Sequence, residues 1–310
     1  MNPFSISEQH PALTLDADPK AYIALGREVR KGERGYIMSR GELVRFSKNP
    51  WKWVKSEPVN ATSEMQWGSV VDCMALTPSR FKDQYEVCPE TYPTADGDKP
   101  WNWNASFCKN WRRDLEATGK EPIKLMDLEE ARIAHSRLME DPLIAALFSQ
   151  SKTQVQCVVE YCDKDTGLKV LVKTLLDLVP NAGSEHEKFI ADLKTTKDAS
   201  VYEWEKSVFH QGYHVQSAMY LDAYNAATGE DRSGFLHVVQ ESAPPYAVGR
   251  RMLGDDFLEL GRQTYQSALK FYCQCLEANK WPGFDDMNDN SANPIIDGWR
   301  ITSPSSWMVS

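Results

Sequence analysis

The sequence has no apolar run of about 18 residues, which argues against a membrane-spanning helix. Its first residues, MNPFSISEQHPALT, lack the basic start and the apolar stretch of a signal peptide. It also has no disulfide framework, because its seven cysteines are odd in number and irregularly spaced, at positions 73, 88, 108, 157, 162, 273 and 275. These absences predict a cytoplasmic protein with reduced thiols and no membrane partner.

The sequence also lacks an excess of positive charge, since its formal net charge is −9 at pH 7. The distribution of charge matters more than the total, because a local basic surface can attract phosphates. Residues 20–55 contain ten basic residues and only three acidic ones. Aromatic residues interleave with them: Tyr22, Tyr36, Phe46, Trp51 and Trp53. This composition fits a DNA-facing segment, and it equally fits a solvated helical face with aromatic residues in the core.

Hydrophobic periodicity and helix-breaking residues predict one α/β domain around a mixed sheet. Helices are expected at 39–48 (capped by Ser39 and ending before Pro50), 65–76, 104–118, 127–149 (capped by Asp127), 201–227 and 255–278. Strands are expected at 155–161, 169–179, 188–193 and 235–240. The expected organisation is a loosely ordered or peripheral N-terminal segment at 1–35, the domain at 36–285 and a C-terminal tail at 286–310.

A charged pair follows an apolar run in ADLKTTKDAS, residues 191–200. Side chains alternate across a strand, so Asp192 and Lys194 emerge on the same face. Asp177 lies in another apolar strand, KTLLDLV, where a carboxylate is costly unless a partner or a metal balances its charge. If the two strands pair, two carboxylates and a lysine converge at one sheet edge. They would form either a structural ion pair or a site for Mg²⁺ or Mn²⁺, the hard cations that carboxylates prefer.

In the metal-site interpretation, Lys194 would position or help to deprotonate a water and stabilise charge on a phosphate during phosphodiester hydrolysis. The following helix adds an amide, Gln216, to an aromatic face. The members of that face recur at helical spacing: Phe209, Tyr213, Gln216, Tyr220 and Tyr224. An amide in such a place suits a phosphate or an attacking water. The Trp-rich segment WNWNASFCKNW, residues 101–111, favours packing over base stacking.

The set of Asp177, Asp192-Leu193-Lys194 and Gln216-x-x-x-Tyr220 resembles the PD-(D/E)xK nuclease superfamily. Within it, ADLKTTKDAS followed by GYHVQSAMYLDAY is similar to the RecE (exodeoxyribonuclease VIII) type, relatives of the RecB nuclease domain and lambda exonuclease. MSRGELVRFSKNPWKW resembles the first helix of that family and WGSVVDCMALTP its second. The resemblance implies a restriction-endonuclease-like core, in which helices flank a central mixed β-sheet.

The resemblance also implies a set of metal ligands. Asp177, Asp192 and the Leu193 carbonyl would bind Mg²⁺, with Mn²⁺ as a possible substitute. The second helix of the family usually reads Gly-x-x-x-His with a metal-binding histidine, but here Gly68 is followed by Asp72. Aspartate is a competent ligand for a hard cation, so Asp72 is expected to bind the metal. The substitution could instead mark a shift in metal preference, a loss of activity or another role.

The remaining candidate residues have roles that the resemblance implies. Lys194 would be the catalytic lysine, and Gln216 and Tyr220 would contact DNA or order the site. Glu160, in the strand VVEYCD, matches an acid common in the RecE group and would support the metal shell.

The function implied by the resemblance is that of a Mg²⁺-dependent 5′-to-3′ exonuclease acting on the ends of linear double-stranded DNA in recombination. Its product, a 3′ single strand, would pass to a recombinase or a single-strand annealing protein. A ring-shaped homo-oligomer and a phage or prophage setting are implied in the same way. Two alternatives are a structure-specific or restriction-like endonuclease and a catalytically silent DNA- or protein-binding module of the same fold.

Overall fold

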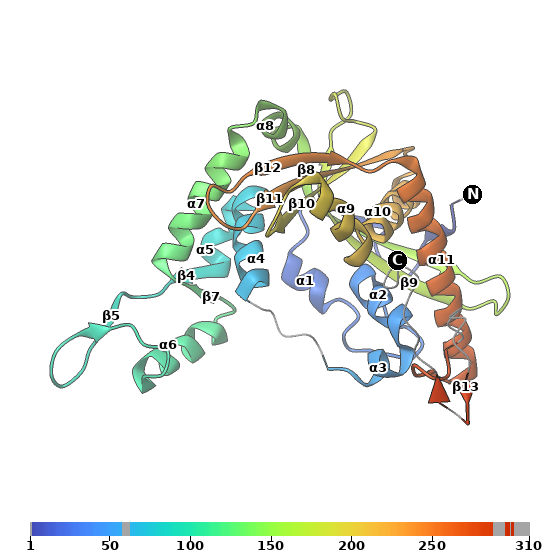
Figure 1. The fold of residues 1–310 in the computed structure, drawn as a ribbon, viewed down its shortest axis with the longest axis horizontal. Helices are drawn as coiled ribbons and strands as arrows, with labels where there is room; N and C mark the ends of the chain where they lie inside the picture. Colours follow the sequence, from blue (N-terminus) through green and yellow to red (C-terminus); the bar gives the residue numbers. More distant parts are fainter. Residues whose placement is uncertain (1, 58–62, 288–294, 298, 301–310) are drawn as a thin grey trace.

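A mixed sheet of eight strands forms the centre of the molecule in the computed structural model, which describes residues 2–57, 63–287, 295–297 and 299–300 (Figure 1). The strands are ordered β1-β8-β9-β10-β11-β12, with β2 added to β8 and β3 added to β9. Their bounds are β1 Phe4–Ile6, β2 Leu13–Thr14, β3 Met38–Ser39, β8 Ser151–Cys162, β9 Lys169–Pro180, β10 Phe189–Thr196, β11 Gly234–Glu241 and β12 Val248–Met252. The predicted α/β fold around a mixed sheet is therefore confirmed.

The middle of the sheet combines antiparallel and parallel pairing. β8 and β9 form a long antiparallel hairpin, and β10 runs antiparallel to β9 and parallel to β11. A parallel pair needs a crossover, which α9 (Val201–His210) and α10 (Tyr213–Thr228) supply. Ala191 and Leu193 of β10 pack into one buried cluster and Ile190 into another, as alternation across a strand requires. The sheet therefore separates two helical layers.

The two layers differ in composition. One contains α4 (Ser63–Leu76), α7 (Leu125–Met139) and α8 (Pro142–Ser149). The other contains α9, α10 and α11 (Asp255–Ala278), with α2 (Arg40–Lys48) and α3 (Pro50–Lys55) beside them (Figure 1). The helices α10 and α11 approach closely at Gly261, where an added Cβ would lie 2.1 Å from the His214 carbonyl oxygen. Any side chain at this glycine would push the two helices apart.

Several expected elements are confirmed. The helix expected at 39–48 is α2, in which Ser39 Oγ accepts a hydrogen bond from Glu42 N at 3.3 Å. The helices expected at 65–76, 104–118 and 255–278 correspond to α4, α6 (Ser106–Ala117) and α11. The four expected strands correspond to β8, β9, β10 and β11, each longer than expected.

Two expected helices are wrong, because each is divided in the structure. The helix expected at 127–149 breaks at Asp141, whose carboxylate caps α8 ahead of Pro142, and Asp127 lies in the first turn of α7 rather than at its cap. The helix expected at 201–227 breaks at Gly212, which has a φ of +68° and separates α9 from α10. In each case the sequence pattern continues across a residue that ends or redirects a helix.

The N-terminal segment, expected to be loosely ordered or peripheral, adds strands to the sheet. β1 pairs with β8, with Phe4 opposite Tyr161, and β2 also pairs with β8. Helix α1 (Pro19–Ala24) follows, and Lys173 Nζ of β9 donates to the carbonyls of Tyr22 at 2.7 Å and Leu25 at 2.6 Å. Lys173 thus joins the end of α1 to the sheet.

The cysteines, the apolar helices and the C-terminal residues bear on the remaining predictions. All seven cysteines are free thiols, as expected. Within the described ranges, no helix combines the length and apolar character needed to cross a bilayer. The expected C-terminal tail lies largely outside the described residues; its described part includes the short strands β13 (Ile295–Ile296) and β14 (Trp299–Arg300).

Most aromatic residues of the basic segment 20–55 belong to the core. Trp53 is 2% exposed, and its ring centroid lies 5.5 Å from that of Phe46 and 5.8 Å from that of Tyr272. Trp51, in contrast, is 55% exposed. Core packing therefore explains these rings better than base stacking does. Seven basic residues of the segment are exposed and can meet an anionic partner: Lys20, Arg27, Arg30, Arg34, Lys48, Lys52 and Lys55.

Residues 88–120, here called the arm, project from the domain between β4 (Tyr85–Val87) and β7 (Glu121–Ile123) (Figure 1). The arm contains a small hairpin, β5 (Thr91–Tyr92) with β6 (Lys99–Pro100), and helix α6. Its interior is aromatic, since the Trp101 ring centroid lies 5.1 Å from that of Trp111 and 5.6 Å from that of Trp103. The packing predicted for the Trp-rich segment is confirmed.

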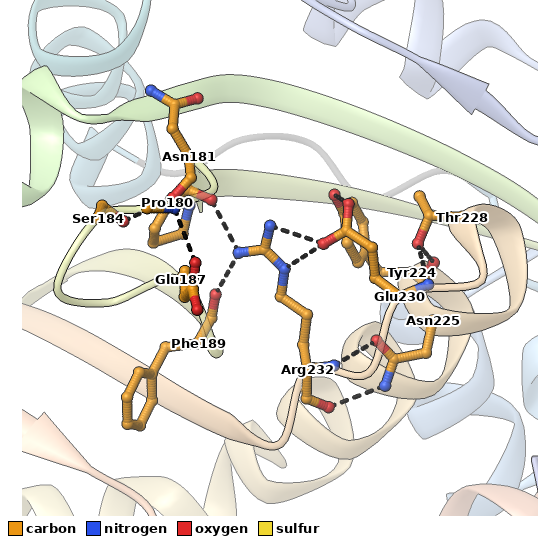
Figure 2. Close-up of polar contacts among 11 residues, drawn as sticks. Pro180, Asn181, Ser184, Glu187, Phe189, Tyr224, Asn225, Thr228, Glu230 and Arg232 are labelled. Carbon is orange, nitrogen blue, oxygen red and sulfur yellow. Dashed lines mark hydrogen bonds and ion pairs between the residues drawn. The ribbon is translucent and has the colours of Figure 1, made fainter.

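Arg232, which precedes β11, holds two strand ends together (Figure 2). Its guanidinium group donates to the Pro180 carbonyl at 2.9 Å, at the end of β9, and to the Phe189 carbonyl at 3.0 Å, at the start of β10. Arg232 Nε also donates to Glu230 Oε2 at 2.9 Å. The Arg232 side chain is only 5% exposed, so water cannot readily replace these donors.

We expect Arg232→Met to lower the free energy of unfolding by about 2–4 kcal/mol, because two buried carbonyls and Glu230 lose their donor. Urea denaturation of the two proteins measures the difference. The matched control is Arg113→Met, since Arg113 is 71% exposed and pairs with an equally exposed Asp114. The control should change stability by less than about 0.5 kcal/mol. Equal stability of Arg232→Met and wild type would contradict this account of Arg232.

Candidate active site

The ladder between β9 and β10 opens where the predicted acids lie. Ala191 pairs with Leu178, and one step further in this register Asp192 lies opposite Asp177. Instead of a carbonyl of β9, Asp177 Oδ2 accepts the hydrogen bond from Leu193 N, at 3.0 Å. The Asp177 side chain thus substitutes for a backbone acceptor, and opposite residues of a pair share a face. The convergence of Asp177 and Asp192 that the sequence predicted is present.

The carboxylate of Asp192 is buried and has two side-chain neighbours. It is 2% exposed, forms an ion pair with Lys194 on the same face of β10, and accepts a hydrogen bond from Gln216 Nε2 at 2.6 Å. Gln216 Oε1 in turn accepts from Arg40 Nη2 at 2.7 Å. A chain of polar contacts therefore runs from α2 through α10 to β10, and it fixes the orientation of the Gln216 amide.

A cavity of about 550 Å³, called the catalytic cavity below, lies beside this chain. Its lining is Arg40, Gly68, Ser69, Asp72, Leu193, Lys194, Thr195, Thr196, Lys197, Gln211, Tyr213 and Ser242. Helix α4 approaches β10 directly here, since a Cβ on Gly68 would lie 2.9 Å from Thr195 Oγ1. The lining includes three cationic side chains and one acid, so the cavity suits an anionic group such as a phosphate.

The acids of the site repel one another in the absence of a cation. Burial raises the pKa of Asp177 well above its usual value, and the charges of Asp192 and Asp72 raise it further. Burial likewise raises the pKa of Asp72 to about 7, although Lys194 opposes the shift. Burial alone would lower the pKa of Lys194, but the charges of Asp192 and Asp177 outweigh burial and hold this pKa above its usual range. Lys194 is therefore an ammonium group at neutral pH.

The other two predicted residues are placed differently. Tyr220 on α10 is 7% exposed and packs beneath the site, and burial raises its pKa to about 12. Its position suits ordering of the site rather than contact with DNA. Glu160 is not brought to the site, because it lies about 20 Å along β8 from Gln154, the neighbour of Asp177. Glu160 instead pairs with Lys169 at 2.8 Å, so the supporting role expected for it has no structural basis.

The structure adds residues that the sequence analysis missed. Arg40 and Lys197 line the catalytic cavity, and His237 lies opposite Asp192 on β11. His237 is 1% exposed, and burial lowers its pKa to about 3, so its imidazole is neutral. Arg40 directly follows Ser39, the helix cap that the sequence did indicate. A cation is unfavourable in the first turn of a helix, so its presence there was a signal that Arg40 has another role.

The donor chemistry of the site fits a hard divalent cation. Asp72, Asp177 and Asp192 offer only oxygen atoms, and a cation would relieve the repulsion that raises the pKa values of Asp72 and Asp177. Over the described part of the chain, however, no group of three or more His, Cys, Asp or Glu side chains is already arranged around one metal position. The carboxylate oxygens of Asp192 are bound instead by Lys194 and Gln216. Cation binding would therefore require Asp192 to exchange partners.

Residues 46–287 match a family described as a PDDEXK-like domain of unknown function (DUF3799). The chain belongs to this family. The resemblance to the PD-(D/E)xK superfamily is thereby confirmed, and PDDEXK nucleases generally use divalent metal ions. Asp177, Asp192 and Lys194 lie within the matched range and remain the predicted counterparts of the acids and the lysine after which the superfamily is named.

The PDDEXK-like chain also resembles solved structures. One is described as a "putative exonuclease" from Eubacterium rectale, with a TM-score of 0.55 and 13% identity over 96% of this chain and 98% of that chain. This likeness shows the fold. Another is Rai1 from Scheffersomyces stipitis in complex with (3'-NADP)+ and calcium ion, with a TM-score of 0.27 and 10% identity over 93% and 76% of the two chains, which is too low to support an argument. No curated protein matches the sequence.

We expect the affinity for Mn²⁺ to rise steeply with pH around pH 7, because the Asp72 carboxyl must lose its proton before it binds a cation and its pKa is raised to about 7. Asp72→Asn should weaken Mn²⁺ binding at pH 8 by at least about tenfold and flatten the pH dependence. Isothermal titration calorimetry at pH 6, 7 and 8 measures both effects. Asp114→Asn, on the exposed surface of the arm, is the control. A pH-independent affinity in the wild type would contradict this expectation.

Without metal, the raised pKa of Asp72 makes the free energy of unfolding fall as pH rises, whereas the affinity for Mn²⁺ rises. The pKa of Asp72 in the folded state, about 7, exceeds the 3.8 usual for an aspartate side chain, so the folded protein binds more protons than the unfolded chain between these two pH values. The contribution of Asp72 to stability is therefore present at low pH and lost as pH rises toward 7. Asp72→Asn should be more stable than wild type above pH 7 in EDTA, and this advantage should vanish near pH 4. Urea denaturation between pH 4 and pH 8 measures this difference in the free energy of unfolding, and a more stable wild type above pH 7 would contradict the expectation.

Proposed function

We propose that the protein is a metal-dependent deoxyribonuclease that hydrolyses phosphodiester bonds. The observation that carries the proposal is the convergence of Asp177, Asp192, Lys194 and Gln216 beside a cation-lined cavity. Three acids with oxygen donors would hold the metal, with the Leu193 carbonyl as a further ligand. When bound, such a cation supplies Lewis-acid stabilisation of the charge that develops on the phosphate.

The cationic side chains of the chain itself have separable roles in this reaction. Arg40 and Lys197 line the catalytic cavity and can bind non-bridging phosphate oxygens of the substrate. Lys194 carries a proton at neutral pH, so it acts as a donor to the developing negative charge rather than as a base. Gln216, held by Arg40, presents an amide of fixed orientation. The three cationic side chains bind and orient the phosphate, whereas Gln216 holds the Asp192 carboxylate, and such positioning is a large part of catalysis.

The finer proposal is a RecE-like 5′-to-3′ exonuclease that uses Mg²⁺ on linear double-stranded DNA. The sequence resemblance supports it, and so does the match to a PDDEXK-like family. A cytoplasmic location, a ring-shaped homo-oligomer, and a role in recombination beside a recombinase or annealing protein in a phage setting belong to the same proposal. The Eubacterium rectale structure, which is described as a "putative exonuclease", also supports this proposal.

Replacing Lys194 by Ala should lower the rate of DNA hydrolysis by about 10²–10⁴-fold, because the phosphate loses a cationic donor to its developing charge. Release of label from end-labelled linear duplex with Mg²⁺ or Mn²⁺ measures the rate. Lys206→Ala is the matched control, since Lys206 lies on the surface of α9 and pairs with Glu203. If neither the wild type nor Lys206→Ala cuts any DNA, the nuclease proposal fails, and the catalytically silent module is the alternative that remains.

Comparison of linear and covalently closed circular DNA of the same sequence separates the exonuclease from the endonuclease. We expect the linear form to be degraded and the circle to remain intact, because an exonuclease needs an end. Label at the 5′ end should be released as mononucleotides before label at the 3′ end. Cutting of the circle would favour the structure-specific or restriction-like endonuclease instead.

A further inference from the structure

A second, larger cavity adjoins the catalytic cavity and has no role in the reaction described above. Its volume is about 770 Å³, within the ~300–1,000 Å³ usual for small-molecule sites. The two cavities share Ser242 as a lining residue, and successive residues of α4 line the two, Trp67 the second and Gly68 the first. We call the second cavity the aromatic hollow.

The wall of the aromatic hollow is built by two parts of the chain that are distant in sequence. Trp67 comes from α4 in the domain, whereas Trp103 and Arg112 come from the arm. Trp67 is stacked on Tyr246, with 6.1 Å between ring centroids and 12° between ring planes, and the Arg112 guanidinium lies 5.8 Å from the centre of the Trp103 ring. The arm therefore closes one side of the hollow.

Charge is divided between the two cavities. The catalytic cavity has Arg40, Lys194 and Lys197 against a single acid. The aromatic hollow has two bases, Arg112 and Lys124, and three acids: Glu116, Glu121 and Asp127. A strand of DNA is divided in the same way, since its phosphates are anionic whereas its bases are neutral, aromatic and rich in hydrogen-bond donors. Acidic side chains accept hydrogen bonds from the exocyclic amines of bases, and tryptophan rings stack on base faces.

We propose that the aromatic hollow is a base-binding subsite, which receives an unpaired base of the strand whose phosphate lies in the catalytic cavity. The inference rests on the proposed nuclease function and goes beyond it, because it requires the DNA to be unpaired next to the scissile phosphate. Trp103 is the side chain that stacks on the base, and the arm is the element that carries it. The arm thereby has a binding function beyond its own packing.

The test is equilibrium binding of a fluorescent ten-nucleotide oligo-dC, whose bases carry an exocyclic amine, and of an abasic oligonucleotide of equal length, measured in EDTA so that no cleavage occurs. Wild type should bind oligo-dC at least about fivefold more tightly than the abasic strand, because stacking and the hydrogen bonds to the acids act on the base alone. Trp103→Ala should bring the ratio of the two affinities close to one, and Trp103→Phe should retain most of it. Because both ligands are compared on the same protein, partial loss of folded protein does not change the ratio.

Tyr202→Ala is the control, since Tyr202 is an aromatic residue of α9 that is 66% exposed and lies outside both cavities. Its ratio should equal that of wild type. A wild-type ratio of one, or a ratio unchanged in Trp103→Ala, would overturn the inference. If wild type cuts DNA but shows a ratio of one, only this inference fails. If the ratio behaves as expected while no DNA is cut, only the nuclease proposal fails.

Discussion

The site depends on one hydrogen bond within the sheet, which Leu193 N donates to the Asp177 carboxylate rather than to a backbone carbonyl. This hydrogen bond keeps β9 beside β10 after their regular ladder has ended at Ala191. It also places Asp177 next to Asp192, although the two charges repel each other. Lys194 and the Gln216 amide are therefore needed to hold the Asp192 carboxylate in a buried position. The catalytic cavity lies beside these residues and leaves Lys194 accessible to a ligand.

The part of the site that follows from local rules could be predicted from the sequence. Alternation along a strand placed Asp192 and Lys194 on one face, and the pairing of two apolar strands placed Asp177 opposite Asp192. Helical spacing placed Gln216 on the face of α10 that meets the sheet. Each of these inferences uses only residues within one element or in two strands that are adjacent in the chain.

The rest of the site depends on contacts between distant segments, for which a single sequence carries little information. Arg40 reaches Gln216 across 176 positions of the chain, and Trp103 meets the domain only through the fold of the arm. The missed helix break at Gly212 is different, because the signal was present but the flanking apolar pattern concealed it. Glu160 shows the opposite error, since a matching residue type in the right strand lies too far along that strand.

Arg232 is a second contact that holds β9 to β10, and the junction between these two strands is called the seam here. Arg232 binds the end of one strand and the start of the other, whereas side chains span the gap at the opposite end of the seam. The connection at the acids therefore consists of one carboxylate contact rather than a continuous ladder. The distance between Asp177 and Asp192 can then change without separating the strands. The two acids would then be able to rearrange when a cation binds, while Arg232 keeps the ends of the two strands joined.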